Sequence, residues 1–340
     1  MKGNLSVLNK KVNFKNINQL QIELSTYCNA SCACCARNVW GGPLVNRFLK
    51  HHMQPKTWFA LCESQNLQNI DILVLNGNYG DPLMHPMIDT FFEYLIETAP
   101  HLEIVIHTNG AIRNIEFWKK FAQQLKKFAR HNVHFDLDGI GETHYEYRRV
   151  DYDKIIENAK AFIDAGGTAD WRMIVFDHNK HQIETASKLA KQYGFTSFSL
   201  NRAVQDVFYR AEGTSQDDYE IVKTYTAPGR KEVLKLIQQY AWGPEEVEKS
   251  WIDAPCPWLE KGKMQVDPFG RVWPCCYFSL DIFGNLARRE YLKDLQGFND
   301  IHKNSLEKIL SNSYWTDILP TKWKNKEYSR CNNCQGNTVV

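Results

Sequence analysis

Four of the chain's ten cysteines lie within eight positions, from Cys28 to Cys35. Cys28, Cys32 and Cys35 follow the spacing C-x3-C-x2-C, and Cys34 stands beside the third thiol. Thiolates are soft ligands, and three on one short loop can hold three irons of a [4Fe–4S] cluster while the fourth iron stays open. A zinc site and a disulfide are the alternatives for so dense a set of thiols. The loop therefore predicts metal or redox chemistry.

The rest of the composition favours a metal over a disulfide. The first fifteen residues are mostly polar and lack the apolar segment of a signal peptide, and no apolar run approaches the roughly 20 residues of a membrane span. We therefore expect a cytoplasmic protein with no membrane partner, in a compartment where structural disulfides are rare. The net charge of +2 does not indicate nucleic acid. The basic stretch 119–130 carries apolar residues at helical spacing, as an amphipathic helix does.

Apolar stretches of strand length alternate with helical patterns from residue 20 to about residue 203. The six expected strands are 20–24, 70–75, 102–107, 133–137, 170–176 and 197–200. The expected helices are 55–65, 85–98, 115–130, 152–165 and 181–193. This alternation predicts an α/β fold with parallel strands. Six strands are fewer than the eight of a closed TIM barrel, so we expect a partial (βα)6 TIM-like barrel.

The patterning divides the chain into four parts. Residues 1–18 are an N-terminal extension, 19–204 form the barrel, and 205–254 form a polar connector with one helix at 230–240. Residues 255–340 hold five further cysteines and form a small C-terminal α+β domain. Within it, Pro268-Phe269-Gly270 separates two short strand patterns and predicts a β-hairpin. Ser305 is the expected N-cap of a later helix.

Polar residues follow several of the expected strands. They are Gly80-Asp81, Asn109 and the segment from Asp136 to Asp138. Parallel sheets bind ligands at the carboxyl ends of their strands, so these side chains should share a site with the cysteine loop. Each segment alone is also compatible with an ordinary turn or a solvated carboxylate. Arg172 and Arg202 also lie at or near strand ends and could face a substrate.

At this point the chain resembles the radical S-adenosylmethionine (radical SAM) enzymes. The resemblance rests on the cysteine spacing, on Gly80-Asp81-Pro82 in place of Gly-Glu-Pro, and on Thr108-Asn109-Gly110 at the third strand. It extends to Asp136-Leu137-Asp138, followed by an arginine that is either Arg148 or Arg149. Asp136 stands where serine is usual. Cys34 stands where an aromatic residue usually packs by the adenine.

The resemblance implies both cofactors and site residues. A [4Fe–4S] cluster on Cys28, Cys32 and Cys35 would bind SAM and, when reduced, cleave it to a 5′-deoxyadenosyl radical that abstracts hydrogen from a substrate. An electron donor of the flavodoxin or ferredoxin type is then needed. The implied SAM contacts are Gly80, Asp81, Pro82, Asn109, Asp136, Asp138 and Arg148.

The C-terminal cysteines resemble those of the auxiliary-cluster domains called twitch and SPASM. Cys256, Cys275, Cys331 and Cys334 are four well-spaced thiols, enough for one auxiliary [4Fe–4S] cluster, and Cys276 has no assigned role. A full SPASM domain carries more cysteines, so the resemblance favours the reduced, twitch-like form. Four thiolates also suit a structural Zn²⁺, which remains an alternative.

Three functions follow from these observations. The first is a radical SAM oxidoreductase that modifies or oxidises a peptide or protein. The second is a radical SAM dehydrogenase of a small molecule such as a sugar, nucleotide or antibiotic precursor. The third is a non-catalytic iron–sulfur or zinc binding module. About eighteen residues precede the first strand, too few for a separate leader-peptide-binding domain, so a peptide would be bound directly or through another protein.

Overall fold

The computed structural model describes residues 16–33, 35, 37–38, 41–42, 44, 48–203, 207–210, 221–243, 258, 262–276, 278–279, 295, 297–325 and 327. Its centre is one curved sheet of eight strands in the order β10-β9-β1-β2-β3-β4-β5-β6. The six barrel strands are β1 (Gln19–Ile22), β2 (Ile72–Leu75), β3 (Glu103–Thr108), β4 (Arg130–Asp136), β5 (Ala169–Val175) and β6 (Ser197–Arg202). They are all parallel, so the predicted partial (βα)6 barrel is confirmed.

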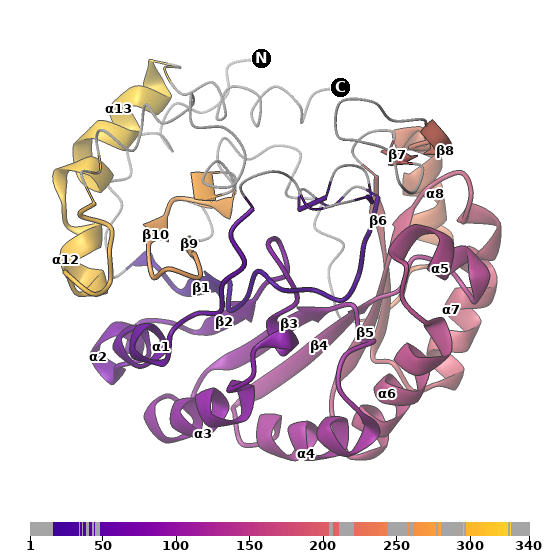
Figure 1. The fold of residues 1–340 in the computed structure, drawn as a ribbon, viewed down its shortest axis with the longest axis horizontal. Coiled ribbons are helices and arrows are strands. Elements are labelled where there is room, and N and C mark those ends of the chain that lie inside the picture. Colours follow the sequence, from indigo (N-terminus) through magenta and orange to yellow (C-terminus); the bar gives the residue numbers. More distant parts are fainter. Residues whose placement is uncertain are drawn as a thin grey trace.

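Helices cover the outer face of this sheet (Figure 1). They are α1 (Pro55–Leu61), α2 (Ser64–Leu67), α3 (Ile88–Thr98), α4 (Ile115–Leu125), α5 (Glu142–Arg148), α6 (Tyr152–Asp164) and α7 (Ile183–Gln192), with the short turns η3 (Pro82–Met84) and η4 (Lys180–Gln182). Large aromatic residues fill the space between helices and sheet. Trp118, Phe121, Phe135 and Phe162 are all fully buried there. Burial of such side chains stabilises the barrel, because each removes a large apolar surface from water.

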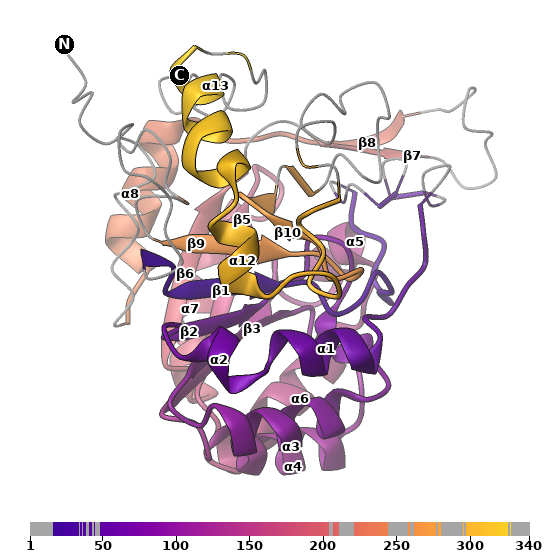
Figure 2. The ribbon, with the colours of Figure 1, turned by 90° about the vertical axis from the view of Figure 1, so that its left-hand side faces the viewer.

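The C-terminal part of the chain extends the barrel sheet. The predicted hairpin forms β9 (Lys263–Val266) and β10 (Val272–Trp273), which pair antiparallel. β9 also pairs in parallel with β1, from Gln19 with Lys263 to Ile22 with Val266. Figure 2 shows α12 (Leu306–Leu310) and α13 (Leu319–Lys324) on this side of the molecule, with η7 (Tyr314–Ile318) between them. Ser305 caps α12 as predicted, with Oγ accepting from the Lys308 amide at 3.3 Å.

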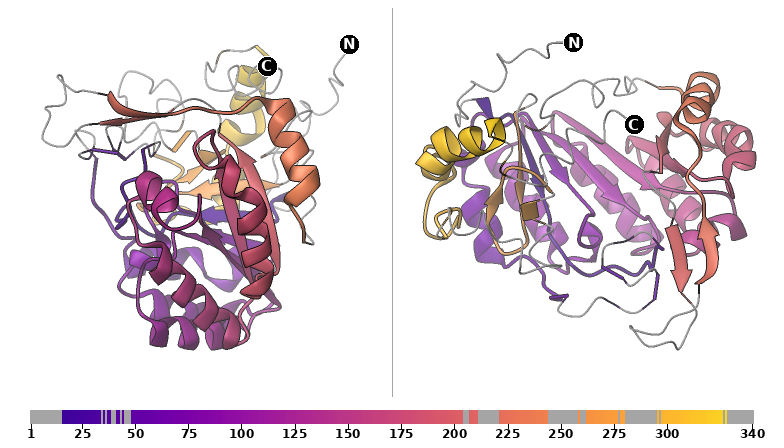
Figure 3. Two further views of the ribbon diagram at one scale, coloured as in Figure 1. Left: turned by 90° about the vertical axis from the view of Figure 1, so that its right-hand side faces the viewer. Right: turned by 90° about the horizontal axis from the view of Figure 1, so that it is seen from above.

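Three segments differ from the predicted pattern. The helix expected over 55–65 is broken between α1 and α2, because the side chain of Asn66 donates to the Ala60 carbonyl that a continuous helix would use. The helix expected over 115–130 ends at Leu125, and Arg130 already begins β4. The connector holds, besides the predicted α8 (Arg230–Tyr240), an antiparallel pair that was not expected, β7 (Val207–Arg210) and β8 (Ile221–Tyr225). Figure 3 shows this pair beyond β6, at the opposite edge from β10.

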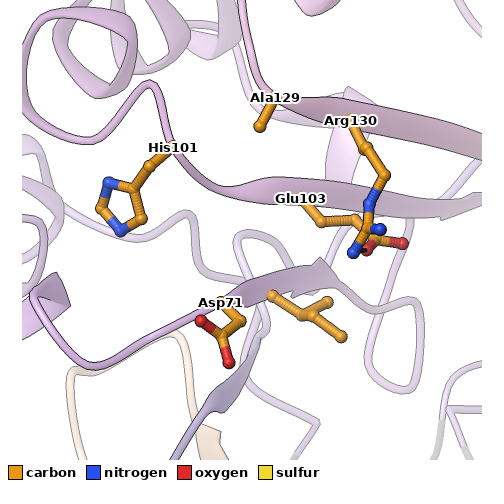
Figure 4. Close-up of a pocket in the computed structure, with 6 residues that line it drawn as sticks. Asp71, His101, Glu103, Ala129 and Arg130 are labelled. Carbon is orange, nitrogen blue, oxygen red and sulfur yellow. Dashed lines mark ion pairs between the residues drawn. The ribbon is translucent and has the colours of Figure 1, made fainter.

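A surface cleft of about 310 Å³ lies at the amino ends of the strands, far from the cysteine loop. Figure 4 shows Glu103 and Arg130, the first residues of β3 and β4, facing each other in it. Their side chains form an ion pair of 2.5 Å. The other lining residues are Asp71, Ile72, His101 and Ala129. Ligands of parallel sheets bind at the opposite ends of the strands, so we do not assign this cleft to the predicted site.

No helix among the described residues combines the length and apolar character that crossing a membrane requires.

Candidate active site

The cysteine loop follows β1 at the carboxyl end of the sheet, as predicted. Cys28, Cys32 and Cys35 are half-buried, and the Cys35 amide donates to the Cys32 carbonyl at 3.1 Å. The Cys28 sulfur lies 3.4 Å from the amide of Ala30 and 3.5 Å from Nδ2 of Asn109, both of which donate to it. Donors of this kind stabilise a thiolate ligand, so the loop has the chemistry of a cluster-binding segment.

The electrostatic surroundings of Cys28 favour its protonated form in the absence of a metal. Burial, and the nearby carboxyl of Asp81, raise the pKa of the Cys28 thiol to about 11, although Arg37 opposes the shift. Cluster iron holds cysteine as thiolate, and binding of the metal then releases the proton. Among the described residues, no three Cys, His, Asp or Glu side chains are gathered at metal-binding distance. The fit to a cluster therefore rests on the donor set: three soft thiols on one loop, with amide donors to Cys28.

Gly80 and Asp81 pack directly on the chain that leads into the cysteine loop. A Cβ atom at Gly80 would lie 2.5 Å from the Tyr27 carbonyl oxygen and 2.6 Å from that of Ser25. The Asp81 amide donates to the same Tyr27 carbonyl at 2.8 Å. Only glycine leaves room for this contact, so the turn and the loop are held together by backbone. Pro82, buried, starts the turn η3 directly afterwards.

The carboxylate of Asp81 connects the ends of β2 and β3. One oxygen accepts from the Leu83 amide at 3.0 Å, and the other accepts from Thr108 Oγ1 at 2.9 Å and from the Asn109 amide at 2.8 Å. Burial nevertheless raises the pKa of Asp81 to about 6, because three hydrogen bonds only partly replace water. Asn109 continues the chain of contacts to Asn29 Oδ1 at 2.9 Å as well as to Cys28. Three predicted site residues, Cys28, Asp81 and Asn109, thus lie in one network.

A buried carboxyl that no sequence motif indicates, that of Glu23, holds the same turn. Glu23, just after β1, accepts from the side chain of Asn78 at 2.8 Å, the Tyr79 amide at 3.2 Å and the Gln265 side chain at 3.1 Å. Full burial raises its pKa to about 7. In the sequence, Glu23 is a single acidic residue between two aliphatic residues, Ile22 and Leu24, both of which are buried. Glu23 therefore ties together β1, the glycine-containing turn and β9.

Two aspartates, Asp136 at the end of β4 and Asp138 just after it, have different surroundings. Asp138 is fully buried, and its oxygens accept from Nε of Arg148 at 2.5 Å and from the Ile174 amide at 2.6 Å. The Asp136 side chain is 28% exposed, and its nearest cation is Arg148, at 3.9 Å. Burial raises the pKa of Asp136, and the neighbouring arginines oppose the shift. Asp136 is therefore open to a ligand, while Asp138 orients an arginine.

Arg148 faces the site and Arg149 does not. The Arg148 carbonyl accepts from the Ser31 amide at 3.2 Å, which joins the end of α5 to the cysteine loop. Burial lowers the pKa of Arg148, but Asp138 and the nearby Cys32 outweigh it and raise that pKa above its usual range, so the positive charge is permanent. Arg149 has a left-handed backbone conformation, with φ of 60°, and its exposed guanidinium lies over the Tyr145 ring. This geometry favours Arg148 in the choice that the sequence left open.

The second cysteine set falls largely outside the described residues. Of its four predicted ligands only Cys275 is described, half-buried beside Cys276, whereas Cys256, Cys331 and Cys334 lie outside, as does Cys34 of the first loop. The turn after Cys275 contacts the glycine-containing turn of the barrel, because the Tyr79 hydroxyl donates to Oγ of Ser279. Cys275 thus lies in a part of the chain that contacts the glycine-containing turn of the first site.

Two family models match the chain. The model of the radical SAM superfamily matches residues 22–190, which contain the cysteine loop and the strands β2 to β5. The chain belongs to the radical SAM superfamily. A model of the iron–sulfur cluster-binding domain SPASM matches residues 256–335. The suspected family and its C-terminal iron–sulfur domain are therefore confirmed, and with them [4Fe–4S] clusters and SAM as cofactors.

Three known proteins illustrate the likeness. GTP 3′,8-cyclase of Syntrophomonas wolfei is 23% identical over 145 residues, which are 42% of this chain and 41% of that protein. Streptococcus suis SuiB bound to S-adenosylmethionine superposes with a TM-score of 0.57 at 16% identity, over 90% of this chain and 68% of SuiB. The protein anSMEcpe with bound AdoMet gives a TM-score of 0.57 at 16% identity, over 91% of this chain and 82% of that one. At identities this low, the superpositions show that the fold is shared and nothing finer.

Proposed function

We propose that this protein is an enzyme that reductively cleaves SAM and abstracts a hydrogen atom from its substrate. The observation that carries the proposal is the convergence of three separate segments on one cysteine loop. The Asp81 amide bonds to Tyr27, the Asn109 side chain to Cys28, and the Arg148 carbonyl to Ser31. When bound, a reduced [4Fe–4S] cluster supplies the electron that converts SAM into methionine and a 5′-deoxyadenosyl radical.

Each neighbouring residue has a proposed role in holding SAM. Cys28, Cys32 and Cys35 would hold the [4Fe–4S] cluster, which would bind SAM through its amino and carboxylate groups. Arg148, fixed by Asp138, provides a permanent charge for the carboxylate. The remaining contacts are proposed at the backbone of Gly80, Asp81 and Pro82, at Asn109 and at the carboxylate of Asp136. The proposed role of Asp138 is to hold the Arg148 side chain in position.

A peptide or protein is our preferred substrate. Two proteins that share the fold of this chain have been solved with peptides. SuiB has been solved with its precursor peptide SuiA, and anSMEcpe with the peptide Cp18Cys. A small molecule is the second candidate, supported by the match to GTP 3′,8-cyclase. The inner wall of the barrel suits either, because polar and charged side chains line it. They include Gln21, Asn76, His107, Asp136 and Arg172, all half-buried.

The C-terminal cysteines complete the proposal. Cys256, Cys275, Cys331 and Cys334 are proposed to hold one auxiliary [4Fe–4S] cluster within a unit of residues 255–340, next to a barrel of 19–204 and a connector of 205–254. An iron–sulfur domain is favoured over zinc by the SPASM match. A flavodoxin or ferredoxin in the cytoplasm is the proposed electron donor.

Anaerobic incubation with SAM and dithionite, followed by assay of 5′-deoxyadenosine, tests this function. We expect product from the reconstituted protein and none after Cys28, Cys32 and Cys35 are replaced by alanine. Cys62→Ala, a fully buried thiol in the core, is the matched control. If a protein with an intact, reducible cluster forms no 5′-deoxyadenosine, the non-catalytic binding module becomes the better description.

A further inference from the structure

Arg172 lies on the inner wall of the barrel, in the middle of β5, where it is half-buried. Its Nη1 donates to Nδ1 of His107 at 2.9 Å and to Nδ1 of His134 at 3.1 Å. The two histidines are paired in register on β3 and β4. Three neighbouring strands thus contribute to one cluster that faces the inside of the barrel.

The hydrogen bonds determine the protonation of both histidines. A guanidinium only donates, so each Nδ1 must be an acceptor and each ring carries its proton on Nε2. Burial and the charge of Arg172 lower the pKa of His107 and of His134 well below the usual value, which agrees with neutral rings. His134 then directs Nε2 toward Oδ2 of Asp170, 3.5 Å away. The histidines therefore orient Arg172 without neutralising it.

Among the described residues, the Arg172 guanidinium has no carboxylate within ion-pairing distance, unlike those of Arg148 and Arg130. Arg148 is paired with Asp138 at 2.5 Å, and Arg130, in the cleft of Figure 4, with Glu103 at 2.5 Å. Within the described part of the chain, no carboxylate oxygen lies within 4.0 Å of the Arg172 guanidinium, and only its Nη1 is hydrogen-bonded. Its neighbour in register, Asp136, makes its ion pair with Arg148 instead.

Asp136 and Asp170 act on Arg172 only from beyond ion-pairing distance, and a half-buried guanidinium with no carboxylate in contact is stabilised by a ligand that supplies negative charge. Nε and Nη2 of Arg172 remain as two parallel donors, a geometry that matches two oxygens of a carboxylate or phosphate. The position fits the substrate, because Arg172 lies beside Asp136, next to the region assigned to SAM, and Arg148 already serves the SAM carboxylate in our proposal. We propose that Arg172, held by His107 and His134, binds a carboxylate or phosphate group of the substrate. This inference rests on the proposed function for its assignment to the substrate.

Isothermal titration calorimetry on the reconstituted full chain tests the proposal, with pyrophosphate and succinate as the two probes, each titrated with and without SAM. We expect one of the two to bind, and the better probe distinguishes a phosphate from a carboxylate. Arg172→Gln should weaken that binding at least tenfold. Arg172→Lys keeps the positive charge but not the two parallel donors of the guanidinium, so its affinity for the probe should lie between those of the wild type and Arg172→Gln. Such residual binding would show that the loss of affinity in Arg172→Gln is not a failure to fold.

Arg130→Gln is the matched control, because it removes an arginine at the other end of the same barrel. It should bind the probe as the wild-type protein does. The proposal is overturned if neither probe binds the wild-type protein, if Arg172→Gln binds as tightly as the wild type, or if Arg172→Gln loses SAM binding instead. The titrations without SAM make the result independent of the 5′-deoxyadenosine assay, so failure of either proposal is recognised separately.

Discussion

The side-chain amide of Asn109 donates to the sulfur of Cys28 across 3.5 Å, from the end of one strand to the loop after another. Hydrogen bonds to ligand sulfur stabilise the reduced, more negative state of an iron–sulfur cluster. Asn109→Asp keeps an acceptor for the Ala111 amide but removes this donor. We expect a reduction potential lower by about 50 mV, taking about 1 kcal/mol for the bond in a one-electron couple. A redox titration followed by electron paramagnetic resonance measures it.

Asn29→Asp is the control for the added charge. Asn29 is exposed beside Cys28, and its Oδ1 accepts from Asn109, so the Asn109 donor remains in this variant. Equal shifts in the two variants would mean that charge alone, and not the hydrogen bond, sets the potential.

Glu23 should make stability depend on pH. Its folded pKa of about 7 lies above its ordinary value of 4.5, so the folded protein holds the proton more tightly than the unfolded chain. Its contribution is fully present below pH 4.5 and is lost as pH rises through 7, by about 3 kcal/mol at most. Urea unfolding of the metal-free protein should therefore show that the wild type loses more stability than Glu23→Gln between pH 5 and 8. Parallel pH curves would contradict this assignment, and Glu116→Gln, on an exposed side chain, controls for loss of a carboxylate.

Arg148 should be required for SAM binding, and Arg149 should not. Arg148→Gln removes the charge that Asp138 holds beside the cysteine loop, and we expect SAM affinity to fall tenfold to a hundredfold. Arg149→Gln removes an exposed arginine one residue later and should bind SAM normally. Equilibrium dialysis of SAM against the reconstituted proteins compares them. A loss confined to Arg149→Gln would reverse the assignment.

Gly80→Ala should disrupt the contact between the turn and the cysteine loop. The added methyl group meets backbone atoms of residues 25–27 at 2.5 to 2.6 Å, and backbone cannot move aside as a side chain can. We expect a loss of about 1–3 kcal/mol in the free energy of unfolding, together with weaker cluster binding. Gly229→Ala is the control, because a Cβ there meets nothing within 4 Å. Chemical denaturation and iron analysis of both variants measure the difference, and equal stability would refute the packing argument.

The auxiliary site should be visible in the iron content. Two four-iron clusters give about eight irons per chain after anaerobic reconstitution, and Cys275→Ala should lower this to about four. Cys62→Ala, in the apolar core, should leave the content unchanged. Iron near four in the wild type, with one equivalent of zinc, would replace the second cluster by a zinc site.

Much of the barrel could be predicted because its strands and helices are marked locally. The helix at 230–240 was predicted with the bounds of α8, and the cap at Ser305 was recognised from its own residue type. The expected helix over 115–130 extended too far because Phe128 continues the apolar spacing beyond the last helical turn. The chain there turns instead toward Pro100, whose carbonyl accepts from the Ala129 amide, and then enters β4.

What the sequence could not supply were relationships between distant segments. Glu23 is a single carboxylate whose partners, Asn78, Tyr79 and Gln265, come from two other parts of the chain. Arg148 and Arg149 are identical in type, and the left-handed backbone at Arg149 separates the arginine that pairs with Asp138 from the exposed one. Whether a carboxylate lies in contact with Arg172 depends on the side chains that three neighbouring strands place beside it.

The parallel pairing of β9 with β1 has a consequence for biosynthesis. Gln19 and Lys263 are neighbours in the sheet, yet at 5–20 residues per second roughly 240 residues of synthesis, on the order of tens of seconds, separate them. Until β9 emerges, one edge of β1 has no partner, and an unpaired strand edge favours association with other chains. The cysteine loop begins at the end of this same strand. Iron–sulfur assembly on a nascent chain would therefore precede the pairing of β9 with β1. Assembly after release would take place when β1, which leads into the loop, is already paired with both β2 and β9.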